Sequence, residues 1–242
     1  MTSAQIEAEA TRAVEPTKRK RGRPRLTPGT VASPGKNGTS GEAQSVGPEA
    51  LVALALGLLT EQPPSEITRA SLARHAKVDP GLIRYYFKNR DSLMRTVAES
   101  LTESLQRRAS ANPPKASHSA PEQISARVKA LLAFKLDNPF YHRLMMEDMA
   151  RSDSGESRAL FDGVSQSAIT RYGNFLTEGI KDGSLRDVDP SFLYMAIIGL
   201  CDFYVTASPV ILKGLDKKGR KNTNVRYAEF ICDILLNGLR PR

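Results

Sequence analysis

The fold of this chain is decided by the stretch TRASLARHAKVDPGLIRYYFKNRDSL, residues 68–93. It carries two helix-start signals: Thr68 is a favourable N-cap, and Asp79 followed by Pro80 joins an N-cap to the proline that suits a first helical position. The pattern predicts short helices over about 67–76 and 80–86. Two short helices joined by a tight turn form a helix-turn-helix, whose second helix enters the major groove of DNA.

The second helix has an outward face suited to DNA. At about 100° per residue, Ile83 and Phe87 point to the core, whereas Arg84 and Tyr85 point away from it. An arginine can donate two hydrogen bonds to guanine. The residues predicted to lie in the groove are Pro80, Gly81, Leu82, Arg84, Tyr85 and Tyr86, and those predicted to lie at phosphates are Thr68, Arg69, Lys88 and Arg90. The alternative is that they only pack a helical hairpin.

This stretch resembles the DNA-binding signature of the TetR family of bacterial transcriptional regulators. The matching positions are Thr68, Leu72-Ala73, Ala76, Val78, Gly81, Tyr86-Phe87 and Leu93. Three positions depart from the family pattern: Lys77 replaces the usual turn glycine, Asp79 the usual serine and Arg84 the commoner tyrosine. The resemblance covers about residues 48–240. It implies a C-terminal helical domain that binds a small molecule and pairs two subunits through its last two helices.

The rest of the chain also reads as helical, so the predicted fold class is all-α. A first helix begins at Pro48 and is expected to end at Pro63-Pro64, and a longer helix follows Asn89. Further helices are predicted over about 122–136, 139–151, 156–182, 189–207 and 224–239. The proline-rich stretch from Asn112 to Pro121 separates a DNA-binding domain, 47–110, from a C-terminal regulatory and dimerisation domain, 121–242.

Residues 1–46 are predicted to be a disordered basic arm, because they nearly lack large apolar side chains. Six of the eight residues in 18–25, KRKRGRPR, are basic. Within them Arg21, Gly22 and Arg23, followed by Pro24, resemble an AT-hook core, in which arginines enter a narrow A·T-rich minor groove. The alternatives are a tail that binds phosphates without sequence preference and, from composition alone, a nuclear localisation signal.

Charge and composition favour a polyanionic partner. The net charge is +9 and the pI is about 9.7. The first ten residues lack the apolar stretch of a secretory signal, and the apolar stretches 50–59 and 193–201 are shorter than the roughly 20 residues that span a bilayer. We therefore expect a soluble, cytoplasmic protein without membrane contact. Double-stranded DNA is the predicted partner.

The last two helices carry more apolar surface than one subunit needs. Residues 190–205 are apolar almost all round, so one side can face the core and another a second subunit. On the final helix Val225, Ala228, Cys232, Leu235 and Leu239 form a stripe, with Phe230, Ile231 and Ile234 beside it. A homodimer through these helices is predicted, with internal packing as the alternative.

Aromatic and methionine side chains in the C-terminal half are candidates for lining a small-molecule pocket. They are Phe134, Tyr141, Met145, Met149, Tyr172, Phe175 and Tyr194, with Phe140 and Met146 nearby. Such side chains at helical spacing are also ordinary core residues. The pocket is implied by the family resemblance, and the identity of its ligand is open.

Catalysis is not predicted. His142, Glu147 and Asp148 share a region without a metal-ligand spacing, and Cys201 and Cys232 read as inert core residues rather than a redox switch. We expect no catalytic residues, cofactor or metal. The predicted function is a sequence-specific, ligand-responsive DNA-binding regulator, most simply a repressor on a pseudo-palindromic operator. The alternative is an architectural DNA-binding protein that acts through the basic arm with little sequence specificity.

Overall fold

The computed structural model describes residues 46–111, 118–214 and 216–241, which belong to one compact unit, Gln44–Arg242. The predicted basic arm, including Arg21, Gly22 and Arg23, lies outside the described residues. The described part is helical, without a strand, which confirms the predicted all-α class.

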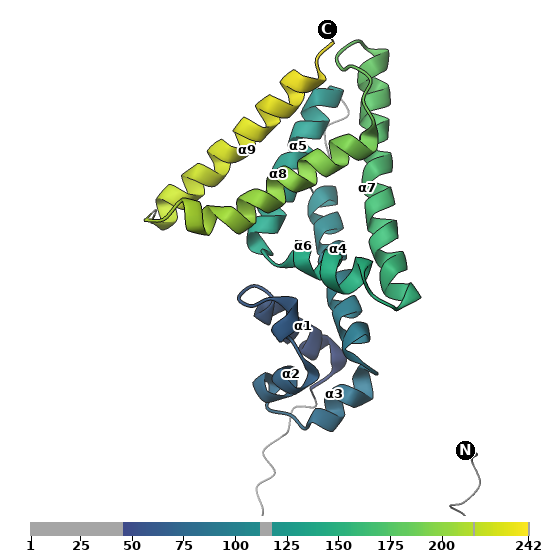
Figure 1. Ribbon diagram of the computed structural model, residues 1–242, viewed down its shortest axis with the longest axis vertical. Coiled ribbons are helices and arrows are strands. Elements are labelled where there is room, and N and C mark those ends of the chain that lie inside the picture. The colour runs from purple at the N-terminus through teal and green to yellow at the C-terminus, as the bar shows by residue number, and fades with distance from the viewer. Residues whose placement is uncertain (1–45, 112–117, 215, 242) are drawn as a thin grey trace, which may run out of the picture. The chain divides into compact units, whose positions relative to one another are not determined.

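Helices follow one another along the whole described chain (Figure 1). In order they are α1 (Pro48–Leu58), η1 (Pro64–Glu66), α2 (Arg69–Ala76), α3 (Pro80–Tyr86), α4 (Arg90–Ala111), α5 (Ala120–Asp137), α6 (Tyr141–Arg143), η2 (Leu144–Ala150), α7 (Gly155–Lys181), α8 (Pro190–Ile211) and α9 (Lys217–Leu239). The segment η1 is a 3₁₀ turn and η2 is π-helical.

The helix-turn-helix forms as the capping signals predict. The hydroxyl oxygen of Thr68 accepts a hydrogen bond from the backbone N–H of Ser71, 3.0 Å away, in a reciprocal capping box. The Asp79 carboxylate accepts one from the N–H of Gly81 at 2.6 Å. Both predicted N-caps are confirmed. Between the helices Lys77 adopts a left-handed conformation, with φ 54°.

The first helix is shorter than predicted. It ends at Leu58 rather than at the Pro63-Pro64 pair. The chain turns directly after Leu58, and in this turn the Thr60 hydroxyl donates a hydrogen bond to the carbonyl of Gly57, 2.7 Å away. The prolines instead begin the 3₁₀ turn η1. The prediction that they end the helix was therefore wrong.

Three C-terminal helices also differ from their predicted bounds. The segment predicted as one helix over 139–151 divides into α6 and the wider π-helical η2. Helix α9 begins at Lys217, because Asp216 caps it through the N–H of Gly219, 2.6 Å away. The first two turns of α9 are polar, so apolar periodicity placed its start only near residue 224. Helix α8 continues to Ile211, through Pro209.

Two hydrophobic cores hold these helices together. The first combines side chains of α1–α4 with residues of α5, α6 and η2, namely Phe134, Tyr141, Leu144, Met145 and Met149. The second joins α5, α7, α8 and α9. Figure 1 shows α1–α3 at one end of this unit and α8 with α9 at the other. The first core therefore extends from the helix-turn-helix into the C-terminal helices.

Helix α8 has 22 residues and, of the described helices, is the one long and apolar enough to cross a membrane by length and composition. This corrects the expectation, based on the stretch 193–201, that no segment reaches that length. Leu193, Ile197 and Cys201 pack in the second core, and Asp202 forms an ion pair within the unit. A core helix of a folded domain shows the same properties.

The left-handed Lys77 leads to a stability prediction. Replacing Lys77 by glycine should raise the free energy of unfolding by about 0.5–1 kcal/mol, since a side chain in this conformation is strained and glycine is not. Urea unfolding of the full chain measures the change. Lys77→Ala is the matched control, which removes the charge but keeps the strain and should give no gain. A glycine variant no more stable than wild type would show that Lys77 is unstrained.

Candidate DNA-binding and ligand-binding sites

Helix α3, the predicted recognition helix, buries and exposes the faces that the sequence predicts. Ile83 is fully buried and Phe87 is nearly so, which anchors the helix in the first core. On the opposite face Arg84 is exposed, and the Tyr85 ring has 81% of its surface exposed to solvent. Tyr86 is half-buried and meets Tyr85 edge to face, with ring centroids 5.1 Å apart. This arrangement leaves Arg84 and Tyr85 exposed on the face of α3 opposite the core.

The start of α3 has little room for a side chain. At Gly81 a Cβ atom would lie 2.7 Å from the Asp79 carboxylate oxygen that accepts the Gly81 N–H. Pro80 and Gly81 are exposed and Leu82 is half-buried. The Asp79 carboxylate is thus used in capping the helix, although it replaces the serine of the family pattern.

The four residues predicted to contact phosphates differ in their exposure to solvent and in their contacts within the protein. Thr68 is exposed while its hydroxyl caps α2, and Lys88 is also exposed. Arg69 donates from Nη1 to the Lys88 carbonyl at 3.1 Å, which ties the start of α2 to the segment between α3 and α4.

Arg90, the fourth predicted phosphate contact, is instead bound within the protein. Its guanidinium forms an ion pair with Asp148 of η2 and donates to the carbonyl of Pro64 at 2.6 Å. Arg90 therefore joins the first turn of α4 to η2. No local pattern predicts this contact, because Asp148 and Pro64 lie 58 and 26 positions away along the chain.

Three further polar contacts attach the first turns of α4 to the start of α7 and to the loop before it. The Asp91 carboxylate accepts hydrogen bonds from the hydroxyls of Ser152 and Ser157, at 2.5 and 3.0 Å. Arg95 forms an ion pair with Glu156. Helix α4 follows the recognition helix directly, so these contacts link the orientation of α3 to η2 and α7.

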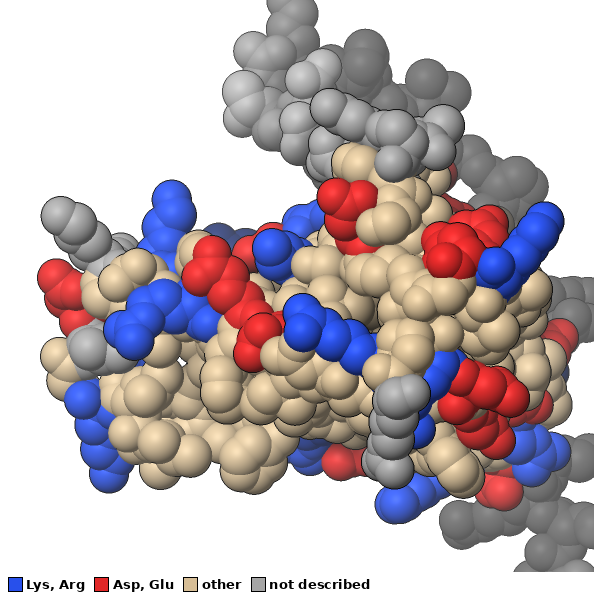
Figure 2. Space-filling model, turned by 90° about the horizontal axis from the view of Figure 1, so that it is seen from above, with Lys and Arg blue, Asp and Glu red and all other residues tan. Residues whose placement is uncertain are grey.

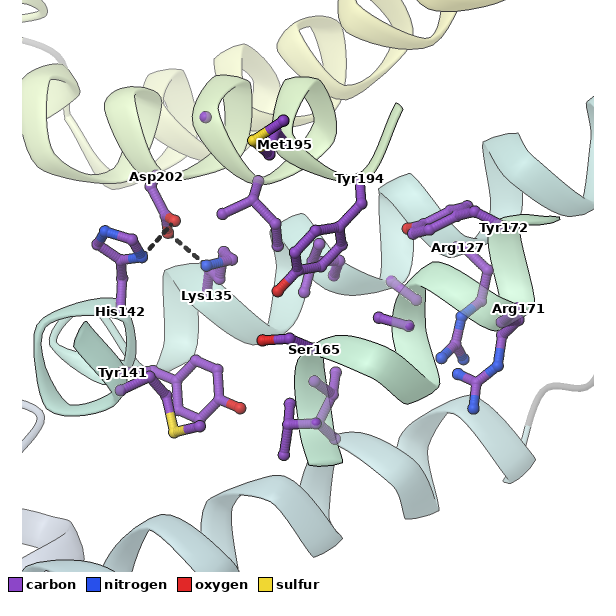
Figure 3. Close-up of a pocket in the computed structure, with 18 of the residues that line it drawn as sticks. Arg127, Lys135, Tyr141, His142, Ser165, Arg171, Tyr172, Tyr194, Met195 and Asp202 are labelled. Carbon is purple, nitrogen blue, oxygen red and sulfur yellow. Dashed lines mark hydrogen bonds and ion pairs between the residues drawn. The ribbon is translucent and has the colours of Figure 1, made fainter. Parts of the chain in front are cut away.

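A cavity of about 480 Å³ lies between the C-terminal part of α4 and the helices α5 to α8 (Figure 3). Among the predicted pocket residues, Tyr141, Met145, Tyr172 and Tyr194 line it. Phe134 and Met149 lie fully buried in the first core, and Phe175 packs against the second core. Further apolar lining comes from Leu105, Leu131, Met146, Phe161, Val164 and Ile198.

One wall of the cavity carries a polar cluster that the sequence analysis missed. The ammonium group of Lys135 is bound to Asp202 of α8, and Nδ1 of His142 lies 2.8 Å from the second oxygen of that carboxylate (Figure 3). This last contact is a hydrogen bond when the proton resides on Nδ1. The Lys135 side chain is buried, with its nitrogen 5.8 Å from the centre of the Tyr141 ring.

The environment of this cluster favours the ionised form of Asp202. Burial by itself raises the pKa of Asp202, but the hydrogen bond with His142 and the charge of Lys135 outweigh it and lower the pKa overall. Next to Asp202, burial raises the pKa of the Cys201 thiol to about 12. Cys201 is thus a weakly acidic core thiol. An aspartate within an apolar helix was the available signal for the cluster.

Helices α8 and α9 leave large apolar side chains exposed, namely Phe192, Met195, Phe203, Val210, Ile211, Val225, Phe230 and Ile234. Of the predicted α9 stripe, Ala228, Cys232 and Leu239 are buried in the second core instead, as is Ile231.

Figure 2, seen from the end that carries the C-terminus in Figure 1, shows acidic and basic side chains intermixed with tan surface rather than one continuous basic patch. The described residues hold no group of three or more metal-ligating side chains.

A helix-turn-helix unit joined to helices that enclose a cavity is the arrangement of a regulatory DNA-binding protein. The C-terminal part, residues 118–241, matches the model of the tetracyclin repressor-like C-terminal domain. Because this match covers more than half of the chain, the protein belongs to the TetR family. No curated protein sequence matches it.

Solved structures share the fold at low sequence identity. A bacterial regulatory protein of the TetR family from Rhodococcus RHA1 is 18% identical, with a TM-score of 0.63 over 78% of this chain and 96% of that one. FadR from Bacillus subtilis, solved with stearoyl-CoA, is 18% identical, with a TM-score of 0.59 over 78% and 98%. AibR, solved with isovaleryl coenzyme A and operator DNA, is 14% identical, with a TM-score of 0.58 over 80% and 98%.

The buried Lys135–Asp202 pair can be tested by removing its acid. Asp202→Asn should lower the free energy of unfolding by about 3–5 kcal/mol near neutral pH, because it leaves the buried Lys135 without a counter-charge. Replacing both residues, Lys135→Met with Asp202→Leu, is the matched control and should recover most of the loss. Urea unfolding measures all three proteins.

The same pair gives a pH dependence with a definite sign. Folding lowers the pKa of Asp202. The contribution of Asp202 to the free energy of unfolding is therefore complete above the pKa of an unfolded aspartate, about 4, and is lost as the pH falls through the lower pKa of the folded state. The stability gap between wild type and Asp202→Asn should therefore narrow below about pH 4. If the free energies of unfolding of wild type and Asp202→Asn differed by less than about 1 kcal/mol at neutral pH, the Lys135–Asp202 pair would not stabilise the fold as proposed.

Proposed function

We propose that this protein is a ligand-responsive transcriptional regulator, most simply a repressor, which binds a pseudo-palindromic operator as a homodimer. The observation that carries the proposal is the recognition helix, whose Arg84 and Tyr85 are exposed while Ile83 is buried behind them. Membership of the TetR family supports the same reading. The protein would act where the chromosome is accessible, which in a bacterium is the cytoplasm.

In the proposed complex, the exposed face of α3 lies in the major groove. Arg84 forks onto a guanine, and the residues around it, Pro80, Gly81, Leu82, Tyr85 and Tyr86, follow the groove wall and neighbouring bases. Thr68, Arg69 and Lys88 lie at phosphates, which position the helix without reading sequence. Arg90 serves this interface through its internal contacts with Asp148 and Pro64.

The dimer is proposed to form through the exposed apolar side chains of α8 and α9. A two-fold axis would bring the same patch of both subunits together and bury the side chains that a single subunit leaves in water. Two helices from each subunit then make a four-helix interface. Such a dimer presents two recognition helices to two half-sites of an operator.

Effector binding is proposed to act through η2 and α7, which contribute Met145, Met146, Phe161 and Val164 to the cavity. A ligand that favours a different position of these elements shifts the first turn of α4 through Arg90 and Asp91. The recognition helices of the dimer then no longer match the spacing of the groove. FadR and AibR, which share the fold, were solved with acyl-CoA molecules, which supports an organic effector in this fold.

The basic arm remains a part of the proposal that lies outside the described residues. Arg21, Gly22 and Arg23 would enter an A·T-rich minor groove next to the half-site, as arms that precede a helix-turn-helix do. If the arm carried all of the binding, the protein would be an architectural DNA-binding protein, with a steep salt dependence and little sequence preference.

The recognition helix can be tested with one base contact and one phosphate contact. Arg84→Ala should weaken binding to the selected operator by about 1–3 kcal/mol and relax the sequence preference at one position of each half-site. Lys88→Ala, the matched control, should weaken binding to operator and random DNA alike. Fluorescence anisotropy at fixed salt measures both. Equal losses on operator and random DNA for Arg84→Ala would make Arg84 a phosphate contact only.

The dimer can be tested on its surface without changing the fold. Phe203 on α8 has 69% of its surface exposed, so Phe203→Glu should leave the subunit folded but place two carboxylates at the proposed two-fold interface. Sedimentation should then show a monomer, with operator affinity reduced at least about tenfold because one half-site is lost. Ile180→Glu, at an exposed apolar residue of α7, is the control and should stay dimeric. Equal dimerisation of both variants would exclude the α8 interface.

A further inference from the structure

The residues that line the cavity include more basic than acidic side chains. Four basic residues contribute to it, Arg108, Arg127, Lys135 and Arg171, whereas Asp202 is the one acidic residue among its described lining. Two of the four cations have partners within the protein. Arg108 pairs with Asp137 at 2.6 Å, and Lys135 pairs with Asp202.

The other two cations, Arg127 of α5 and Arg171 of α7, have no hydrogen bond or ion pair with any described residue. Both are partly buried. Figure 3 shows their side chains extending from two different helices in the same direction, at the end of the view away from His142 and Asp202. Two guanidinium groups held at one cavity repel each other, and an anion between them relieves that repulsion.

Guanidinium groups are suited to carboxylates and phosphates, because their planar N–H donors match two oxygen acceptors at once. The remaining wall is chiefly apolar, with Leu131, Met145, Met146, Phe161 and Ile198 among its residues. The cavity volume of about 480 Å³ lies within the usual range for sites that enclose a small organic molecule. The arginine end and the apolar wall of the cavity therefore suit two chemically different parts of one ligand.

We infer that the ligand of this cavity is an anionic amphiphile, whose carboxylate or phosphate is bound by Arg127 and Arg171 and whose hydrocarbon part fills the apolar wall. This inference rests on the proposed function only in taking the cavity as the effector site. It adds the chemical class of the effector and the residues that select it. Tyr194 and Ser165, whose hydroxyls point into the cavity between its two ends in Figure 3, can hydrogen-bond a polar group along the chain.

The test compares four probes that share a ten-carbon chain: decanoate, decyl phosphate, decanol and decylamine. Isothermal titration calorimetry with the full chain, in the absence of DNA, should show that an anionic probe binds at least about tenfold more tightly than decanol, and that decylamine binds least. The ratio between decanoate and decyl phosphate identifies which anion the arginines prefer. Equal binding of decanol and both anions by the wild-type protein would overturn the inference without any variant.

Variants then assign the preference to the two arginines. Arg127→Gln with Arg171→Gln should abolish the advantage of the anions while leaving decanol binding unchanged, and Arg127→Lys with Arg171→Lys should restore part of it. Arg158→Gln, at an exposed arginine of α7, is the matched control and should keep the full preference. An anion preference that survives the double glutamine variant would overturn the inference.

The result of the probe titrations can be distinguished from the result of the DNA-binding experiments. Absence of binding by all four probes would contradict the anionic amphiphile, whereas DNA binding through Arg84 is tested without any ligand. Tight binding of decanol alone would keep an effector cavity and reject its anionic selectivity. Circular dichroism of each variant before titration shows that the protein compared is folded.

Discussion

The orientation of the recognition helix depends on burial of its inner face in a core that it does not build alone. Helix α3 has seven residues, too few to be stable as an isolated helix. Its position is fixed because Ile83 and Phe87 pack into the first core, which continues through α4 to Phe134, Tyr141 and Met145. A packed core transmits displacement rather than absorbing it. The helix proposed to contact DNA and the cavity wall are therefore parts of one continuous packing arrangement.

Polar contacts determine how that packing can move. Arg90, Asp91 and Arg95 attach the first turns of α4 to η2 and to the start of α7. On the other side of the cavity, Lys135 and His142 bind Asp202, which belongs to the helix proposed to form the dimer interface. A ligand in the cavity would touch both α4, which follows α3, and α8, the helix proposed to pair the subunits. This is the geometry that ligand-dependent DNA binding requires.

Local signals in the sequence were sufficient for the helix-turn-helix and insufficient for the cavity. The caps at Thr68 and Asp79 act within three residues, so their chemistry is visible in the sequence. The contacts Arg90–Asp148 and Lys135–Asp202 join residues 58 and 67 positions apart, and no local pattern encodes such pairs. For the same reason the sequence could not show which of the apolar candidates line the cavity. Tyr172 and Phe134 are both buried, but only Tyr172 is among the residues that line it. No sequence pattern singled out Arg127 and Arg171, which lie 44 positions apart on different helices and meet only at the cavity.

The central claim is that two identical subunits each present an α3 helix, held in a fixed orientation, to DNA. Selection of binding sites by the full chain from a random double-stranded library tests it most directly. We expect enrichment of an inverted repeat, with both half-sites at one fixed separation and the same sequence preference in each, because the dimer axis relates the two recognition helices. Enrichment of A·T-rich DNA without a repeated half-site would contradict the account and would assign binding to the basic arm alone.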